Sequence, residues 1–201
     1  MGAPDCFDDP ARPANDEHTV LDRFDDLARS RRTSLLLDAE RPVDDALVDR
    51  LCELATWAPN HHRTWPWRFA ALTGDARARL GEACAEHLAG RGAPDAKIVK
   101  ALGKYLRAPV MLLVASAHDD DPVVRAENRD AVAAGVQTLL LAATAAGLAS
   151  FWGSGVVTEA PAVRELCGFG PDDQVVAAIY LGWPTGEVPV PERPAPVVHR
   201  P

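Results

Sequence analysis

The sequence has few cysteines, and it has no apolar run long enough to span a bilayer. No Cys-x-x-Cys pair occurs among the four cysteines, which are Cys6, Cys52, Cys84 and Cys167. Their wide spacing argues against a structural zinc site and against a disulfide framework. The longest apolar run covers residues 136–148 and is too short for a membrane helix, and residues 1–16 lack the apolar core of a signal peptide. We therefore expect a cytoplasmic protein with reduced thiols and no membrane contact.

The chain is acidic, with 29 Asp and Glu residues against 21 Lys and Arg residues and a net charge of -8. Because nucleic-acid binding needs a basic face, this balance excludes it as the main function. The 201 residues are 47% hydrophobic, which predicts one domain with a sizeable core. Gly-x-Gly-x-x-Gly, the P-loop motif and His-Glu-x-x-His are all missing, so three common cofactor and metal motifs are excluded.

Hydrophobic periodicity predicts alternating helices and strands. We expect helices after Thr19, after Pro42 and ending at Pro59, from Asp75, and over residues 127–149, the last apolar nearly all round. Apolar runs predict strands over residues 68–73, 110–117 and 175–181, with the middle one buried on both faces. This alternation predicts an α/β or α+β protein.

The two ends of the chain differ in composition from the middle. Residues 1–17 are rich in Pro, Asp and Ala and predict a flexible N-terminal arm. Residues 18–183 hold all the periodic segments and form the expected folded domain. Residues 184–201 are rich in proline, which excludes a helix or a central strand. We expect them to form an extended arm that covers another surface.

Three clusters of residues suggest a binding site. Arg31, Arg32 and Thr33 follow the first helix, and two guanidinium groups beside a hydroxyl suit a phosphate. The alternative is a solvated basic helix end that complements the helix dipole. The third cluster along the chain is Trp-Gly-Ser-Gly at residues 152–155, which allows close approach of the backbone to a ligand, although taken alone it fits a simple tight turn better.

The second cluster along the chain is the loop over residues 58–69, where hydrogen-bond donors alternate with flat rings, as a planar polar ligand requires. His61 is expected either to contact a ligand or to form a structural hydrogen bond. On regular structure, the adjacent His61 and His62 point apart, so we expect them not to share a metal ion.

In this order and at these separations, the clusters resemble the FMN-dependent nitroreductase family. Its short bacterial members begin with Arg-Arg-Ser and carry Ala-Pro-Asp-His and Pro-Trp-x-Phe in the first loop, and the likeness covers about residues 24–183. The resemblance implies an α+β nitroreductase-like fold, with an antiparallel-dominated central sheet wrapped by helices. It also implies a domain-entwined homodimer with two flavin sites at the interface, so residues 18–183 would be the FMN-binding domain.

The resemblance also implies roles for single residues. Arg31, Arg32 and Thr33 would bind the phosphate and ribityl chain of FMN. His61 and Trp65 would reach the flavin of the partner subunit. Trp152, Gly153 and Ser154 would line the isoalloxazine ring.

Several positions depart from the family pattern, among them Thr33, which replaces the usual Ser and keeps the hydroxyl, and Leu35, which stands where many relatives have a further Arg. Trp65 stands where a Gln commonly precedes Pro-Trp, and Gly153 replaces an arginine of the short members. Arg63 and Arg193 are expected to compensate for these losses.

The family activity would pass a hydride from NADH or NADPH through FMN to a small acceptor, such as a nitroaromatic or a quinone, by a ping-pong mechanism. The flavin carries this chemistry, so no catalytic side chain and no metal are expected. One alternative is a protein that holds flavin with little turnover. Another is a flavin-modifying branch that uses reduced FMN as its substrate.

Overall fold

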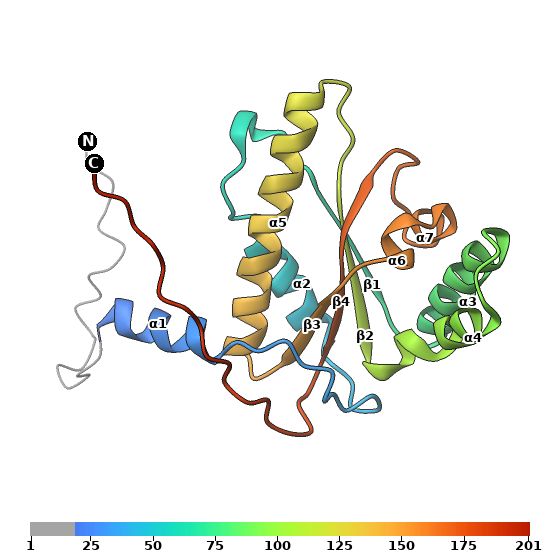
Figure 1. The fold of residues 1–201 in the computed structure, drawn as a ribbon, viewed down its shortest axis with the longest axis horizontal. Coiled ribbons are helices and arrows are strands. Elements are labelled where there is room, and N and C mark those ends of the chain that lie inside the picture. Colours follow the sequence, from blue (N-terminus) through green and yellow to red (C-terminus); the bar gives the residue numbers. More distant parts are fainter. Residues whose placement is uncertain (1–18) are drawn as a thin grey trace.

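A four-stranded antiparallel sheet with the strand order β1-β2-β4-β3 lies at the centre of the computed structural model, which describes residues 19–201 (Figure 1). The strands are β1 (Trp67–Leu72), β2 (Val110–Ser116), β3 (Ala149–Gly153) and β4 (Gln174–Gly182). Each neighbouring pair is antiparallel. This confirms the expected α+β fold with an antiparallel sheet. The arm predicted at residues 1–17 lies outside the described residues.

Helices cover both faces of the sheet, so the fold has three layers (Figure 1). One face packs against α2 (Asp45–Ala55) and α5 (Pro122–Ala145). The other face carries α3 (Asp75–Gly90), α4 (Asp95–Lys104), α6 (Val156–Glu159) and α7 (Pro161–Leu166), together with the 3-10 turn η2 (Tyr105–Arg107). A second 3-10 turn, η1 (His61–Arg63), precedes β1, and α1 (Val20–Ser30) lies at the side of the molecule.

The central strand β2 shows why the sheet is covered on both faces. Every residue of β2 is buried, as its continuous apolar sequence predicts. Because strand side chains alternate between faces, Val110, Leu112 and Val114 pack in the core under α2 and α5. Met111 and Leu113 pack in the core on the opposite face.

The helix expected over residues 127–149 is wrong at both ends. The helix α5 spans Pro122–Ala145, and the Asp121 carboxylate caps it by accepting a hydrogen bond from the Val123 amide at 2.8 Å. A proline is well tolerated in the first turn, where its missing N–H has no helical partner. The helix ends before Gly147, whose φ of 77° is left-handed.

The tight turn that fits residues 152–155 better when they are taken alone is wrong for the first two of them, because Trp152 and Gly153 belong to β3 and pair with β4. The backbone reverses only at Gly155, where φ is 93°. Similarly, α2 ends at Ala55 and not at Pro59, because the chain leaves the helix through a turn at residues 56–58. A residue that precedes proline is disfavoured in helical conformation, so the helix cannot continue to Pro59.

Two peripheral segments are largely exposed. No residue of α1 is buried, and its apolar Leu21 and Phe24 are exposed. Residues 184–201 contain no helix or strand, and Val190 and Val197 are exposed. Within residues 19–201, no helix combines the length and apolarity needed to cross a membrane.

Candidate functional site

The basic segment that follows α1 carries the first predicted cluster. Arg31 is the C-terminal cap of α1, and its amide donates to the Leu27 carbonyl oxygen at 3.2 Å. Within residues 19–201, the Arg31 side chain forms no hydrogen bond or ion pair, so its guanidinium group is available to a ligand. The Arg32 Nη1 donates to the carbonyl oxygens of Arg29 and Arg31, the latter at 2.8 Å.

A backbone bridge places this segment beside β3. Thr33 forms a parallel bridge with Ser150, and the Ser34 amide donates to the Ser150 carbonyl oxygen at 2.9 Å. A second bridge joins Leu37 to Pro184. The structure therefore brings the first and third predicted clusters together along the outer edge of β3.

The third cluster forms the end of β3 and the residues after it. Trp152 is 38% exposed, and its Nε1 donates to the Val176 carbonyl oxygen at 3.3 Å. Gly153 pairs with Ala178 of β4, and Ser154 is exposed in the connection to α6. The indole and these backbone groups thus border the same sheet edge as the basic segment.

A small pocket of about 140 Å³ opens beside Arg32. Its walls come from the basic segment, the end of α5 and the chain after β4: Ser30, Arg32, Ser34, Thr144, Leu148, Ala149, Pro184, Gly186 and Val188. The Arg32 Nε is buried and has no hydrogen-bond partner within residues 19–201. A buried N–H without a partner is costly, and an anion such as a phosphate would satisfy it. These residues therefore fit the phosphate end of FMN.

The second predicted cluster lies in the loop between α2 and β1, and Asn60 organises this loop. The Asn60 Oδ1 accepts from the Trp65 amide at 2.9 Å. The Asn60 Nδ2 donates to the His61 carbonyl oxygen and to the Thr64 Oγ1, both at 3.1 Å. The Thr64 hydroxyl also donates to the Asn128 Oδ1 on α5, so the loop is fastened to that helix.

Three non-glycine residues in this loop adopt left-handed backbone conformations, with φ of 62° at His62, 54° at Arg63 and 51° at Trp65. Such conformations cost about 1–2 kcal/mol each for residues with a Cβ atom. The hydrogen bonds of Asn60 and Thr64 hold the loop in this shape. Strain of this kind concentrates at functional sites.

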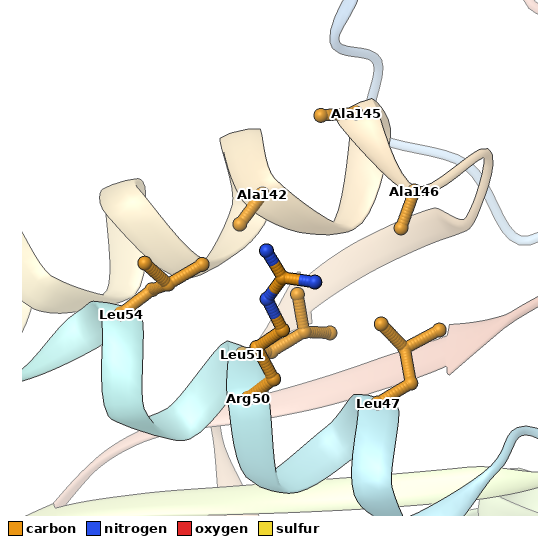
Figure 2. Close-up of a pocket in the computed structure, with 7 residues that line it drawn as sticks. All are labelled: Leu47, Arg50, Leu51, Leu54, Ala142, Ala145 and Ala146. Atoms are coloured by element: carbon orange, nitrogen blue, oxygen red, sulfur yellow. The ribbon is translucent and has the colours of Figure 1, made fainter.

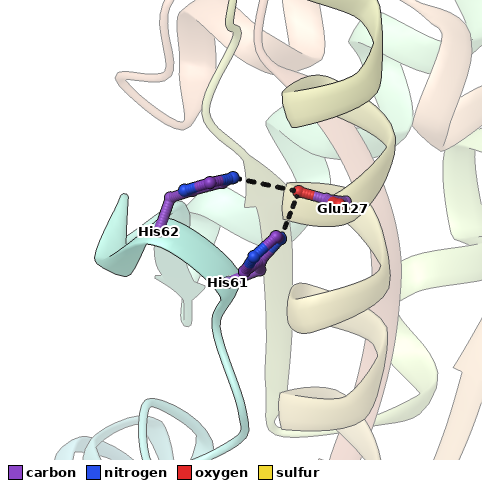
Figure 3. Close-up of side chains that lie close together, drawn as sticks. All are labelled: His61, His62 and Glu127. Atoms are coloured by element: carbon purple, nitrogen blue, oxygen red, sulfur yellow. Dashed lines mark hydrogen bonds and ion pairs between the residues drawn. The ribbon is translucent and has the colours of Figure 1, made fainter.

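The expectation that His61 and His62 point apart is wrong (Figure 3). Their rings stack with centroids 3.8 Å apart, and both face the carboxylate of Glu127 on α5. The His61 Nδ1 lies 2.9 Å from the Glu127 Oε2, and the His62 Nε2 lies 4.0 Å from the same oxygen. The expectation assumed regular backbone, whereas the left-handed φ of His62 turns its side chain back toward His61.

The same loop forms one side of an aromatic pocket of about 390 Å³. Trp57 and Trp65, which are 79% and 61% exposed, contribute its flat walls. The remaining lining residues are Glu53, Thr56, Ala58, Asn60 and Arg63. Arg63 is therefore part of this pocket, whereas Arg193 is exposed in the C-terminal arm.

One chain does not bring the two groups of site residues together. The loop precedes β1 and contacts α5 at Glu127, whereas the basic segment joins β3 and reaches α5 at Thr144. β1 and β3 are the two outer strands of the sheet. Along α5, Glu127 and Thr144 are about 26 Å apart at the usual helical rise. The two groups of candidate site residues thus lie apart, at opposite ends of α5 (Figure 1).

A third pocket, of about 250 Å³, lies between α2 and α5 (Figure 2). Its walls are mostly apolar: Leu47, Leu51, Leu54, Ala142, Ala145 and Ala146 surround the single charged side chain, Arg50. It offers neither the paired donors nor the aromatic walls of the other two pockets. It is therefore a weaker candidate for a polar ligand.

The described cysteines are unsuited to nucleophilic chemistry at neutral pH. Burial, and then the charge of Asp49, raises the pKa of the Cys52 thiol to about 12. Burial, and then Cys84, raises the pKa of Cys167 to about 12 as well. Because the thiolate is the reactive form, these cysteines are structural. All three described cysteines are free, as the sequence predicts.

Some of these residues were not identified from the sequence. Glu127 carries no local signal, because its contact with His61 joins two distant segments. Asn60 and Trp57 lie next to predicted site residues, but neither the hydrogen bonds of the first nor the exposure of the second can be deduced from spacing.

Comparison with known proteins gives matches over most of the chain. The sequence profile of the Nitroreductase family matches residues 28–183. YdjA of Escherichia coli, provisionally named an NAD(P)H nitroreductase, is 31% identical over 160 residues, which cover 79% of this chain and 87% of the relative.

Solved structures agree with these sequence matches. The crystal structure of a nitroreductase-like family protein from Bacillus cereus superposes with a TM-score of 0.69 at 27% identity, over 87% of this chain and 90% of that chain. The FMN-dependent nitroreductase NfnB of Mycobacterium smegmatis, solved with NADPH, gives a TM-score of 0.70 at 20% identity, over 88% of this chain and 96% of that chain. The latter likeness concerns the fold alone.

Proposed function

The chain belongs to the nitroreductase family, and we propose that it is an FMN-dependent oxidoreductase that transfers a hydride from NADH or NADPH to a small acceptor such as a nitroaromatic or a quinone. The observation that carries this proposal is the bridge between Thr33 and Ser150. It aligns two arginines, which suit a phosphate, with an exposed indole and a glycine-rich connection, which suit a flat ring. FMN has both of these parts.

The residues along β3 would hold the cofactor. The guanidinium groups of Arg31 and Arg32 and the hydroxyl of Thr33 would bind the phosphate and ribityl chain through charge-assisted hydrogen bonds. Trp152, Gly153 and Ser154 would border the isoalloxazine ring. When bound, FMN supplies the hydride chemistry in both half-reactions, so the chain needs only to bind, orient and enclose the reactants.

A second copy of the chain would complete each site. The loop with His61, Arg63 and Trp65 lies too far from the basic segment of its own chain, so in a homodimer it would face the flavin of the partner subunit. The exposed Leu21 and Phe24 of α1 support this arrangement, because apolar side chains of this size gain stability when a partner covers them.

The C-terminal arm would then have a role in the dimer. Residues 18–183 would form the FMN-binding domain, and the arm at residues 184–201 would cross onto the partner subunit. Arg193 would add a positive charge near the cofactor phosphate there. The arm exposes Val190 and Val197, which a partner surface would cover.

His61 would act through a fixed ring orientation. Its Nδ1 donates to the Glu127 carboxylate at 2.9 Å. A neutral imidazole that donates from Nδ1 keeps Nε2 unprotonated, as an acceptor for an N–H group of a ligand. This contact would orient the ring, and the proposed role of His61 requires no proton transfer.

The test is a visible absorption spectrum of the purified chain before and after anaerobic addition of NADPH or NADH. We expect a bound flavin whose visible band bleaches on addition and returns when a nitroaromatic or a quinone is added. A flavin that does not bleach would instead indicate a flavin-holding protein. A band that is lost permanently after oxygen is admitted would indicate that reduced FMN is a substrate, and no flavin after incubation with FMN would contradict the proposal.

A further inference from the structure

We propose that His61, His62 and Glu127 form a binding site for a divalent transition-metal ion such as Zn²⁺, between η1 and α5 (Figure 3). This site shares His61 with the proposed contact to the flavin of the partner subunit, but metal binding can be measured without any enzymatic activity.

The three potential ligands converge from two elements. One potential ligand atom of each residue lies within 4.8 Å of those of the other two, and the His61 Nδ1 and the His62 Nε2 are the ring nitrogens near the Glu127 Oε2. Ligand atoms about 2.1 Å from a tetrahedral zinc ion are about 3.4 Å from one another. The present separations of 2.9 Å and 4.0 Å to the carboxylate oxygen lie on either side of that value. Small side-chain rotations therefore suffice to enclose an ion.

The donor set selects the class of ion. Two imidazole nitrogens and one carboxylate oxygen suit zinc, nickel and copper, whereas calcium and magnesium prefer sites made only of oxygen. Three protein ligands leave at least one position of a tetrahedral ion for water. The exposure of both histidine rings keeps that position open to solvent.

The loop is held in the shape that the site requires. His62 reaches the carboxylate only because its backbone is left-handed, with φ of 62°. Asn60 fastens the loop internally, and the Thr64 hydroxyl donates to Asn128, the residue that follows Glu127 on α5. Because these contacts already fix both sides of the cluster, the loop would lose little conformational entropy when an ion binds.

Metal binding would also bear on the orientation of His61. An ion on Nδ1 would occupy the position of the hydrogen bond to Glu127 and would place the ring proton on Nε2. The outward nitrogen would then change from an acceptor to a donor. An ion at this site would therefore alter what His61 offers to a ligand.

Calorimetric titration of the full, untagged chain with ZnCl₂ tests the proposal. We expect saturable binding of one ion per chain, and at least tenfold weaker binding in His62→Asn and in Glu127→Gln. His118→Asn is the matched control, because His118 lies 3.5 Å from Asp120 as an exposed histidine beside a carboxylate outside the cluster. It should bind zinc as tightly as the wild type.

Electron paramagnetic resonance with Cu²⁺ identifies the ligands directly. Hyperfine splitting from two imidazole nitrogens is expected in the wild type, and from one in His62→Asn. If His62→Asn fails to fold, His62→Gly replaces it, because glycine accepts the left-handed backbone. Absence of saturable zinc binding, or equal binding by the wild type and both cluster variants, would overturn the proposal, whether or not the chain binds flavin.

Discussion

Thr33 forms a parallel bridge with Ser150, although one residue lies near the start of the folded chain and the other follows its longest helix. The bridge carries Arg31 and Arg32 to the edge strand that holds Trp152. Residues far apart in sequence thus lie together, whereas the loop with His61 and Trp65 lies at the opposite edge of the sheet. Because of this division, we propose that each flavin site combines two half-sites, one from each of two chains.

Replacing both arginines should release the flavin. Each charge-assisted hydrogen bond to a phosphate contributes about 1.5–3 kcal/mol, so each arginine should change the affinity roughly ten- to hundredfold. We therefore expect Arg31→Ala combined with Arg32→Ala to lose bound FMN on gel filtration, with an unchanged circular dichroism spectrum. Arg79→Ala, an exposed arginine of α3 on the other side of the sheet, is the control. Full flavin occupancy in the double variant would refute the phosphate assignment.

Gly135 permits the close contact of α5 with α2 and β1. A Cβ atom there would lie 2.6 Å from both the Ala55 carbonyl oxygen and the Trp67 Nε1. Gly135→Ala should therefore lower the free energy of unfolding by about 1–3 kcal/mol through overpacking. Gly103→Ala in α4 is the matched control, because a Cβ atom there meets no atom within 4 Å. It should raise stability by about 0.5–1 kcal/mol. Urea denaturation compares the two, and equal effects would contradict this packing.

Alkaline pH should weaken the fold through Tyr180. Burial, partly opposed by Arg107, raises the pKa of this phenol from 10.0 to about 12. Between these values the unfolded chain loses the proton and the folded chain keeps it. The contribution of Tyr180 to stability is therefore fully present below pH 10. Above pH 10 the free energy of unfolding decreases by about 1.4 kcal/mol per pH unit.

Tyr180→Phe isolates this contribution. The Tyr180 hydroxyl is buried with no hydrogen-bond partner within residues 19–201, so its removal should leave stability at pH 7 unchanged or slightly higher. The decrease above pH 10 should become smaller but persist, because burial raises the pKa of Tyr105 as well. Urea denaturation from pH 7 to 10.5 measures the stability at pH 7 and its decrease above pH 10. If the variant loses stability above pH 10 as steeply as the wild type, Tyr180 is not the group responsible.

Local sequence signals predicted much of the secondary structure. The cap at Thr19, whose hydroxyl accepts from the Asp22 amide at 3.1 Å, depends only on neighbouring residues. The continuous apolar run of β2 likewise required burial on both faces. Such features can be read directly because their physical causes lie within one element.

The errors arose where distant residues decide the structure. β3 is short and exists because β4 pairs with it, so its sequence resembled a turn. His61 and His62 converge because Asn60, Asn128 and Glu127 hold an irregular loop. Grouping the basic segment with Trp152 depended on family resemblance, since no spacing in the sequence predicts the bridge between Thr33 and Ser150.

Complementation between two inactive chains tests the division into half-sites most directly. One chain carries Arg31→Ala and Arg32→Ala, and the other carries His61→Ala and Trp65→Ala; each alone should bind little flavin. Co-expressed with different affinity tags and purified through both, the mixed dimer should hold one flavin per pair of chains, because one of its two sites combines intact halves. A mixed dimer as empty of flavin as its parents, or failure of the chains to pair, would contradict a site shared between subunits.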